Sequence, residues 1–324
     1  MLIVQKFGGR SLAVISGLRR AAEIILNAKK QGKQVVAVVS AMGDSTDDLS
    51  ELAYRICPHP PKRELDALIS TGEQQSAALL SIMLCHLGYN ARSFTGAQAG
   101  IFTDGCHGDA CISTIIPQRI STCLDAGDVA VVAGFQGLGD DGSITTLGRG
   151  GSDTSAVALA AALKAEICQI YKDVDGIYTA DPMLVSNAKL LEHIDFRDMH
   201  ALSLCGSQVL HSRSVYTAMK ESLPMLILSS FKKCQGTAVC MLDDDMRPDF
   251  AGLTRDRAKH SLSLVGKAID IDCLEKICDI LSRENIDVLS SEIQDNVLKI
   301  FVEPEYLNSS MKIIHKEFFE KEKE

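Results

Sequence analysis

Residues 145–154 read TTLGRGGSDT and lead directly into a run of small, mostly apolar residues, SAVALAAALK (155–164). Glycine at positions 148, 150 and 151 lets the backbone approach a ligand closely, because no Cβ stands in the way. The small-residue run predicts a helix over residues 154–164, and the first turn of a helix offers unpaired N–H groups to an anion. The segment therefore predicts a glycine loop that binds an anionic ligand at a helix N-terminus.

The polar residues of this loop indicate the chemistry of its ligand. Arg149 carries a planar guanidinium group, which suits bidentate recognition of a carboxylate. The alternative interpretation is an ordinary helix N-cap at one of three residues, Ser152, Asp153 or Thr154. Capping does not account for three glycines that flank an arginine, so we interpret the loop as functional.

Outward from the loop, short apolar runs alternate with helical patterns. The predicted strands are residues 2–4, 34–40, 129–133 and 167–171, and the predicted helices include residues 18–31 and 79–87. The strand runs lack polar alternation, which is typical of strands buried on both faces. This order predicts a parallel sheet covered by helices on both faces, with ligands at the carboxyl ends of the strands.

Further glycine motifs follow or neighbour the predicted strands. The first strand ends in Lys6-Phe7-Gly8-Gly9, where a lysine can attract phosphate and the glycine amides can bind it. Taken alone, this motif is more typical of a simple turn. The other motifs are SAMG (40–43), STGE (70–73) and GFQG (134–137). Strand ends converge on one edge of a doubly wound sheet, so we expect these motifs to form a single site.

The composition is that of an ordinary globular protein and excludes several classes of function. The chain has 324 residues, of which 46% are hydrophobic and 23% charged, so we expect two folded domains rather than disorder. A net charge of −9 argues against non-specific binding of nucleic acid. The most apolar stretch, residues 154–163, is about half the length of a membrane span. We therefore expect no nucleic-acid partner and no membrane partner.

Cysteine usage and the N-terminus favour a cytoplasmic protein. Eleven cysteines are an odd number in a long chain, which fits free thiols better than a disulfide framework. Residues 1–6 are too short for the apolar region of a signal peptide. Cys106, His107 and Cys111 lack the paired spacing of a zinc site, so we expect no metal bound directly by the protein.

The pattern changes after residue 237. Acidic residues 243–245 followed by Pro248 indicate a linker, placed at residues 238–249, with a metal site as the alternative interpretation. Strand and helix patterns then follow in the order β-α-β-β-α, at residues 260–266, 273–284, 288–292, 297–302 and 307–319. This order suits a small ferredoxin-like α+β module. We therefore predict domains at 1–237 and 250–324, with a frayed terminus at 321–324.

Taken in order, the motifs of the first domain resemble those of the aspartokinases, within the amino acid kinase family. They are Lys6–Gly9, Ser40–Gly43, Ser70–Glu73, Phe94–Gly108, Gly134–Gly137, Thr145–Thr154, Lys172–Pro182, Val209–His211 and Ser229–Phe231. The second module resembles an ACT regulatory domain. The resemblance implies an α/β fold: a three-layer αβα amino-acid-kinase domain with a central, mostly parallel sheet, plus one ACT-like domain for regulation or dimerisation.

The resemblance also implies an activity. A kinase of this family would transfer the γ-phosphoryl group of Mg-ATP to the β-carboxylate of L-aspartate, the first step towards lysine, threonine and methionine. A carboxylate with an ordinary pKa of about 3.9 is already ionised at neutral pH, so no general base is needed. ATP and Mg²⁺ are the implied cofactors, with Mg²⁺ held through the phosphates. The implied assembly is a homodimer through the ACT-like domain.

Carried over position by position, the resemblance implies a role for each site residue. Lys6 would contact the transferred phosphoryl group beside the amides of Gly8 and Gly9, and Asp153 would hold Lys6. Arg149 would bind a substrate carboxylate. The amino-acid pocket would be completed by Ser40, Thr46, Glu73, Phe135 and Ser152, with Glu73 as acceptor for the substrate ammonium. The implied nucleotide contacts are Lys172, Asp173 and Tyr178.

Four positions depart from the family pattern. Arg10 and Lys172 stand where the family usually has threonine, Met183 replaces an arginine, and Gln208 replaces the lysine before Val-Leu-His. Losing two cations would weaken ATP binding, while Arg10 and Lys172 could restore positive charge from other positions. The sequence leaves both readings open. The alternative functions are a catalytically weak homologue that acts as a ligand-binding or regulatory subunit, or a kinase for a related amino acid.

Overall fold

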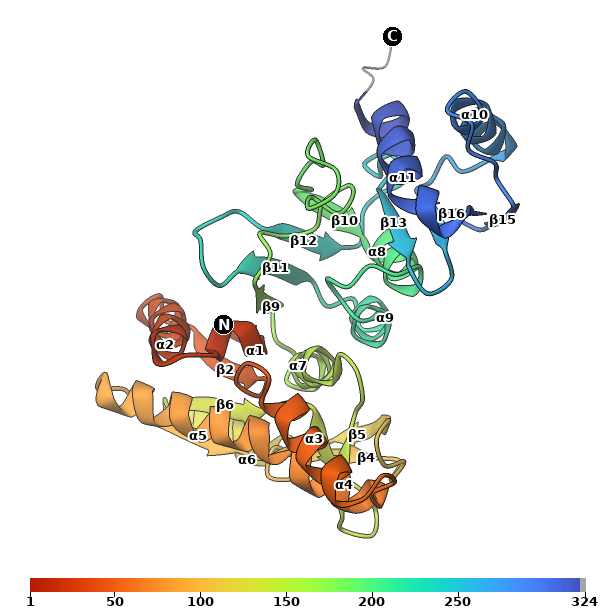
Figure 1. Ribbon diagram of the computed structural model, residues 1–324. Coiled ribbons are helices and arrows are strands. Elements are labelled where there is room, and N and C mark those ends of the chain that lie inside the picture. The colour runs from red at the N-terminus through yellow and green to blue at the C-terminus, as the bar shows by residue number, and fades with distance from the viewer. Residues whose placement is uncertain (321–324) are drawn as a thin grey trace. The chain divides into compact units, whose positions relative to one another are not determined.

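The computed structural model describes residues 1–320, which form two compact units (Figure 1). The first unit contains Met1–Asp175 and Lys220–Gln235. The second contains Gly176–Met219 and the chain from Gly236 onward. The frayed terminus predicted at residues 321–324 lies outside the described residues.

Six neighbouring strands of the first unit form a parallel sheet in the order β11-β9-β1-β2-β6-β3. Their bounds are β1 Leu2–Phe7, β2 Gln34–Val39, β3 Ala91–Phe94, β6 Val129–Ala133, β9 Ile167–Lys172 and β11 Met225–Ser229. Strand β6 is buried throughout, and β1 and β2 are buried except at their first residue. Burial on both faces explains why the sequence of these strands shows no polar alternation.

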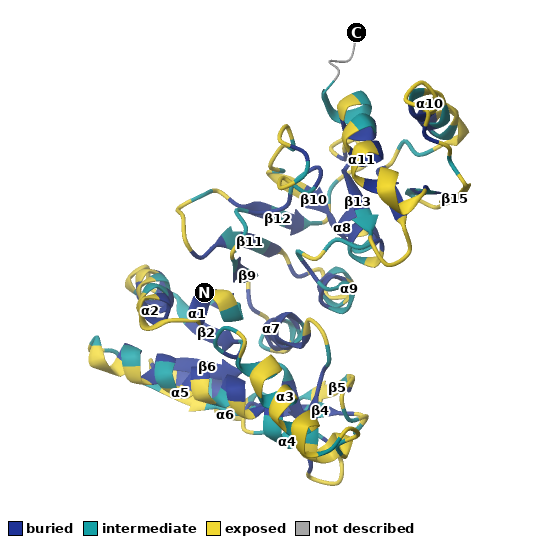
Figure 2. Ribbon diagram, in the orientation of Figure 1, coloured by how far each residue is buried: buried dark blue, intermediate teal, exposed yellow. Residues whose placement is uncertain are grey.

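Helices cover both faces of this sheet. Helices α2 (Ile15–Lys30) and α5 (Thr71–His86) pack against odd-numbered residues of β1, including Ile3 and Phe7. Helix α7 (Gly151–Ala162) contacts β1 and places Asp153 against the even-numbered Lys6. Since successive side chains of a strand point to opposite faces, α7 lies on the face opposite α2 and α5. In Figure 2, β2 and β6 are buried, α2 and α5 have exposed residues, and α7 is largely buried. The predicted three-layer α/β fold is confirmed.

Shorter elements complete the first unit. The helices are α1 Gly9–Leu12, α3 Ser45–Ile56, α4 Lys62–Ile69 and α6 Gln118–Asp125. A second, four-stranded sheet has the order β5-β4-β7-β8. Its strands are β4 Ile101–Thr103, β5 Ile112–Ile115, β7 Gln136–Leu138 and β8 Ile144–Thr146. Strand β8 leads into the glycine loop before α7, so this sheet positions the loop.

The second unit contains a parallel strand pair and an α+β module. Strand β10 (His193–Asp195) pairs with β12 (Thr237–Cys240), and α8 (Phe196–Leu204) and α9 (Ser212–Lys220) lie between them in sequence. The module has an antiparallel sheet in the order β13-β14-β16-β15. These strands are β13 Gly252–Asp256, β14 Ser261–Val265, β15 Ser290–Gln294 and β16 Val297–Phe301.

Two helices pack against this antiparallel sheet. They are α10 (Ile271–Ser282) and α11 (Leu307–His315). The 3-10 turn η1 (Pro304–Tyr306) comes directly before α11, and the π-helical turn η2 (Lys316–Glu320) comes directly after it. The predicted β-α-β-β-α order is present from β14 to α11. Strand β13, which the sequence pattern did not indicate, is added at the edge beside β14.

The compact units divide the chain differently from the predicted domains. Residues 176–219 group with the chain after residue 236, whereas the predicted first domain runs through 1–237. Strand β12 ends at Cys240, so the predicted linker, 238–249, begins inside a strand. The domain boundaries at 1–237 and 250–324 therefore stay a prediction. No helix within residues 1–320 is both long and apolar enough to cross a bilayer.

Candidate active site

A buried ion pair joins the first strand to the helix that follows the glycine loop. Lys6 lies near the end of β1 and Asp153 in the first turn of α7, where the helix dipole favours a carboxylate. The Nζ atom of Lys6 is 2.7 Å from Oδ1 of Asp153, and their side chains are only 7% and 4% exposed. Buried charges are tolerated when they are paired, so each residue fixes the position of the other.

A second ammonium group binds the same carboxylate. Lys172 ends β9, and its Nζ atom is 2.9 Å from Oδ2 of Asp153. Burial alone would raise the pKa of Asp153, but Lys172 and Lys6 outweigh it and hold that pKa well below its ordinary value. Burial lowers the pKa of Lys6 against the opposing effect of Asp153, and the like charge of Lys172 lowers it further. Two ammonium groups that share one carboxylate gather positive charge at this point, which suits phosphate oxygens.

The glycine turns at the ends of β1 and β2 are joined by their backbones. The N–H of Gly43 donates to the carbonyl of Gly9 at 3.0 Å. A Cβ on Gly9 would lie 2.7 Å from the carbonyl oxygen of Ala41, so only glycine fits this approach. The Gly8 amide, predicted to lie beside a phosphate, instead donates to the carbonyl of Tyr171 at 3.1 Å. Gly9 begins α1, and a first-turn N–H has no acceptor within its helix. Of the two amides, that of Gly9 is the one available to an anion.

Glu73 is a buried carboxylate with one oxygen left unpaired. It lies in the first turn of α5 and is 3% exposed. Its Oε1 atom accepts a hydrogen bond from the Ala41 N–H at 3.0 Å, whereas Oε2 is buried without a hydrogen-bond partner among residues 1–320. Burial raises the pKa of Glu73 to about 7, although the Ala41 N–H and the charge of Lys6 favour the ionised form. Such an oxygen fits a ligand ammonium group.

We expect Glu73→Gln to stabilise the ligand-free protein at pH 8 by up to about 3 kcal/mol. The raised pKa means that folded protein binds the Glu73 proton more tightly than unfolded chain does. The stability from this proton is therefore lost as the pH rises from the ordinary value of 4.5 through about 7. Glutamine keeps an acceptor for the Ala41 N–H and carries no charge.

Denaturant unfolding of both proteins at about pH 8 and about pH 4.5 measures this effect. The stability difference should be largest at the higher pH and shrink at the lower one, where Glu73 is protonated. An equal difference at both pH values would show that Glu73 is not the titrating group.

The loop around Arg149 has a backbone geometry that depends on glycine. Gly148 and Gly150, on either side of Arg149, have φ angles of 69° and 70°, a left-handed region that favours glycine. A Cβ on Gly151 would lie 2.8 Å from the Phe135 ring. Arg149 itself is exposed to solvent. This exposure leaves the guanidinium accessible to a carboxylate.

The remaining predicted substrate residues lie just after strands or in the first turns of helices. Ser40 follows β2, and its N–H donates to the carbonyl of Phe7 at 3.1 Å. Thr46 lies in the first turn of α3, and Ser152 is buried in the first turn of α7. Phe135 has a φ of 69°, which is strained for an aromatic residue and typical of functional sites.

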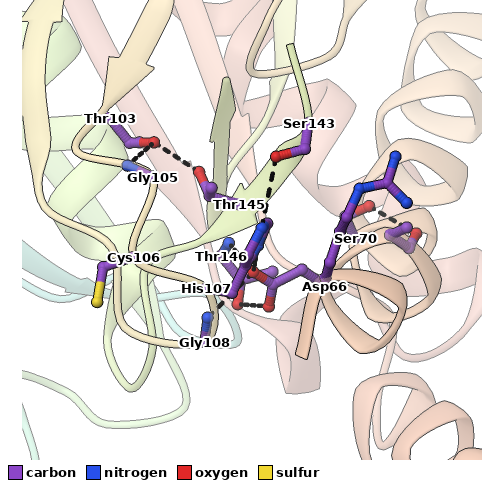
Figure 3. A network of polar contacts seen from close by, with 12 residues as sticks. Asp66, Ser70, Thr103, Gly105, Cys106, His107, Gly108, Ser143, Thr145 and Thr146 are labelled. Carbon is purple, nitrogen blue, oxygen red and sulfur yellow. Dashed lines mark hydrogen bonds and ion pairs between the residues drawn. The ribbon is translucent and has the colours of Figure 1, made fainter. Parts of the chain in front are cut away.

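A hydrogen-bond network around Asp66 holds Thr146, which lies just before the glycine loop (Figure 3). Asp66 of α4 is 1% exposed and accepts hydrogen bonds from the Gly108 N–H at 3.0 Å and the Thr146 N–H at 3.1 Å. It also binds the Thr146 hydroxyl at 2.6 Å and Nδ1 of His107 at 2.9 Å. His107 therefore has a structural role. Asp66 was not predicted, because it lies outside the glycine motifs of the sequence.

The cysteines beside His107 do not form a metal cluster with it. Cys106 and Cys111 are exposed, and the backbone N–H groups of both donate to Oδ1 of Asp104 at 3.1 Å. Among residues 1–320, no three His, Cys, Asp or Glu side chains are grouped to hold a metal ion.

The residues predicted for the nucleotide fall in both units. In the first unit, Asp173 follows Lys172 directly, and its Oδ2 atom is 2.6 Å from a guanidinium nitrogen of Arg10. In the second unit, Tyr178 forms an isolated antiparallel bridge with Leu190. Met183 is 90% exposed, and Gln208 is also exposed. Two of the four departures from the family pattern, Arg10 and Lys172, are thus paired with carboxylates of the first unit.

Comparison with known proteins shows the family of the chain. A model of the amino acid kinase family matches residues 1–229. The chain therefore belongs to the amino acid kinase family. The curated relatives to which it is similar include aspartokinases. The chain is 49% identical over 269 residues to the aspartokinase of Mycobacterium bovis, which covers 82% of this chain and 64% of the relative. It is 45% identical over 289 residues to the aspartate kinase of Pseudomonas putida, covering 89% and 70%.

Solved structures show the same fold. Aspartate kinase from Synechocystis superposes with a TM-score of 0.68 at 37% identity, covering 97% of this chain and 54% of that chain. Aspartokinase III of E. coli in complex with aspartate and ADP superposes with a TM-score of 0.72 at 26% identity, covering 93% and 78%. The chain spans about two thirds of the length of the mycobacterial relatives, or 64%.

Proposed function

We propose that the chain transfers the γ-phosphoryl group of Mg-ATP to the β-carboxylate of L-aspartate, giving 4-phospho-L-aspartate and ADP. The observation that carries the proposal is the buried Lys6–Asp153–Lys172 centre at the carboxyl ends of β1 and β9. The family membership and the aspartokinase relatives support the same reaction.

The chemistry of the reaction needs what this centre provides. In phosphoryl transfer, charge spreads over the equatorial oxygens of the transferred group, and catalysis rests on positioning and charge neutralisation. Lys6 would neutralise this charge from the end of β1, and Asp153 would hold the lysine in place. The first-turn N–H of Gly9 would donate to a phosphate oxygen. No general base is required, because the attacking β-carboxylate is already ionised.

Two further groups fit the α-amino and α-carboxylate groups of aspartate. The unpaired Oε2 atom of Glu73 suits the substrate ammonium, and binding of that cation would favour ionised Glu73. Arg149 would bind the α-carboxylate, for which a guanidinium is well shaped. Phe135, Ser152, Ser40 and Thr46 would complete the pocket. With the ammonium and the α-carboxylate bound in this way, the β-carboxylate is the group left to attack the γ-phosphorus of ATP.

The charged groups of the centre indicate how Mg²⁺ would be held. Both oxygens of Asp153 are bound by ammonium groups, and Oδ2 of Asp173 is bound by Arg10. We infer that the metal ion comes with ATP and is held chiefly by the phosphates. Its chemistry would be to neutralise phosphate charge and orient the leaving group.

Coupled measurement of ADP release tests the reaction. L-aspartate should stimulate ADP release, whereas succinate, which lacks the ammonium, and L-asparagine, which lacks the β-carboxylate, should not. L-glutamate tests side-chain length. Aspartate binding by calorimetry without any turnover would overturn the proposal and favour a regulatory subunit. Faster turnover with another acceptor would reassign the substrate.

The same proposal extends to assembly and location. We infer a cytoplasmic homodimer formed through the module at 250–324. The edge strand β15 is exposed at every residue, and an exposed edge strand offers unpaired backbone groups to a second copy. Light scattering of the full chain should give twice the mass of one chain, and a monomer at micromolar concentration would contradict the inference.

A further inference from the structure

A cavity lies on the face of the first unit's sheet opposite the Lys6–Asp153–Lys172 centre. Its volume is about 820 Å³, within the range of about 300–1,000 Å³ that is typical of small-molecule sites. Gln5 of β1, Tyr171 of β9 and several residues of α2 line it, and all its lining residues belong to the first unit. Gln5 directly precedes Lys6, and successive side chains of a strand point to opposite faces. The cavity is therefore separate from the proposed catalytic centre.

Helix α2 supplies the cavity with an arginine that has an unpaired donor. The guanidinium carbon of Arg20 lies 4.8 Å from the centre of the Phe231 ring, and both residues line the cavity. The Nε atom of Arg20 is buried and has no hydrogen-bond partner among residues 1–320. A guanidinium is always charged, and its planar fork matches a carboxylate. The unpaired donor therefore suits a carboxylate of a ligand.

The strands supply the cavity with an unpaired acceptor. Gln5 is 2% exposed, and its Nε2 atom donates to Oε1 of Gln169 at 2.9 Å. The hydroxyl of Tyr171 donates to the same Gln169 oxygen at 3.3 Å. Oε1 of Gln5 is left buried without a hydrogen-bond partner in the described part of the chain. A buried amide oxygen without a donor costs free energy, so the cavity also suits a ligand N–H or O–H group.

The rest of the lining indicates the body and the charge of the ligand. Tyr171, Leu228 and Phe231 offer aromatic and aliphatic surface. Cations outnumber carboxylates among the charged lining residues, which are Arg20, Lys33, Lys232, Lys233 and Glu23. An anion with a flat apolar body therefore fits this lining better than a cation does.

The loop that carries Phe231 is fixed without a ligand. Lys232 forms an ion pair with Asp175 at 3.1 Å, and Sγ of Cys234 donates to the Asp175 carbonyl at 3.3 Å. Lys232 and Cys234 both line the cavity. Two contacts to one residue hold this part of the wall in place, so the cavity is preformed, as small-molecule sites usually are.

We propose that this cavity binds a small aromatic carboxylic acid that carries a hydrogen-bond donor. The carboxylate binds Arg20, the donor binds Oε1 of Gln5, and the ring packs against Tyr171 and Phe231. The ligand site is separate from the site of the proposed phosphoryl transfer, so ligand and kinase substrates bind at the same time.

Three matched compounds test the site in an NMR titration of the full chain. 4-Hydroxybenzoate has the charge, the ring and a donor, whereas benzoate lacks the donor and 4-hydroxybenzamide lacks the charge. We expect 4-hydroxybenzoate to bind with a Kd below about 5 mM. Benzoate should bind about 5-fold more weakly, and 4-hydroxybenzamide at least about 10-fold more weakly, because a charge-assisted hydrogen bond is the stronger of the two.

Two arginines that are neighbours on α2 provide the variant and its control. Arg20→Met removes the guanidinium and keeps an unbranched side chain, so it should weaken binding of 4-hydroxybenzoate by at least about 10-fold. Arg19→Met changes an exposed arginine that does not line the cavity, and it should leave the affinity unchanged. Alkylation followed by mass spectrometry gives a second readout. Bound 4-hydroxybenzoate should slow alkylation of Cys234, which lines the cavity, and not that of the exposed Cys85.

Each of three results would overturn the site. The first is a Kd for 4-hydroxybenzoate above about 5 mM, and the second is equal affinity in wild type and Arg20→Met. The third is competition with Mg-ADP or L-aspartate, which would place the compound in the catalytic centre. These measurements need no turnover, so they decide on the cavity even if the chain does not phosphorylate aspartate.

Discussion

Asp153→Asn is expected to lower kcat by at least about 1000-fold and to destabilise the folded protein. The substitution removes the one negative charge that lies between Lys6 and Lys172, at 2.7 Å and 2.9 Å. The buried ammonium group of Lys6 and the partly buried ammonium group of Lys172 would then lose the carboxylate that they share. Removing one partner of a buried ion pair costs roughly 3–5 kcal/mol, because the remaining charge is left uncompensated.

Both effects can be measured on the same preparation. ADP release with L-aspartate gives kcat, and denaturant unfolding gives the change in the free energy of unfolding. Asp125→Asn, at an exposed residue of α6, is the matched control and should change neither. An Asp153→Asn variant with wild-type kcat would remove Asp153 from the catalytic centre.

Lys6→Met is expected to lower kcat by roughly 1000-fold with a much smaller loss of stability. The ammonium that neutralises the transferred group disappears, so the transition state loses a charge-assisted contact. Asp153, however, keeps its ion pair with Lys172. Methionine is similar in size to lysine and carries no charge, so it also removes the burial penalty that lowers the Lys6 pKa.

The comparison of Lys6→Met with Asp153→Asn separates catalysis from folding. Thermal and denaturant unfolding should rank Lys6→Met close to wild type and well above Asp153→Asn. A kcat reduced by less than about tenfold would show that Lys6 does not contact the reacting phosphoryl group. A stability loss as large as that of Asp153→Asn would show that Lys172 does not compensate for Lys6.

The strand ends of the first unit were predictable from sequence because their signals are local. Apolar runs without polar alternation indicated strands buried on both faces, and β2 and β6 are such strands. The three glycines around Arg149 indicated a functional loop, and in the structure Gly148 and Gly150 have positive φ angles that favour glycine. These features depend on neighbours in the sequence, so they can be read from it.

Other features depend on contacts between distant residues and had no local signal. Asp66 binds Gly108 and Thr146, which lie 42 and 80 residues further along the chain. The sequence left open whether Lys172 restores lost charge, and only the pairing of β9 with β1 brings it to Asp153. The same pairing extends to the Gly8 amide, which donates to Tyr171.

Strand β13 was missed for a similar reason. Its residues read GLTRD and end in two adjacent charged residues. Such a pattern favours neither a buried strand nor a helix. Pairing with β14 along five residues makes it a strand, and its first three residues are buried. Strand formation at such positions is decided by the neighbouring strand more than by intrinsic preference.

Trapping of the acyl phosphate tests the central claim most directly. The full chain would be incubated with Mg-ATP, L-aspartate and hydroxylamine, which converts an acyl phosphate into a hydroxamate. We predict aspartate β-hydroxamate in amounts equal to the ADP formed, and none with Asp153→Asn. ADP formation without hydroxamate, or equal hydroxamate from Asp153→Asn and wild type, would contradict phosphoryl transfer to aspartate at the Lys6–Asp153–Lys172 centre.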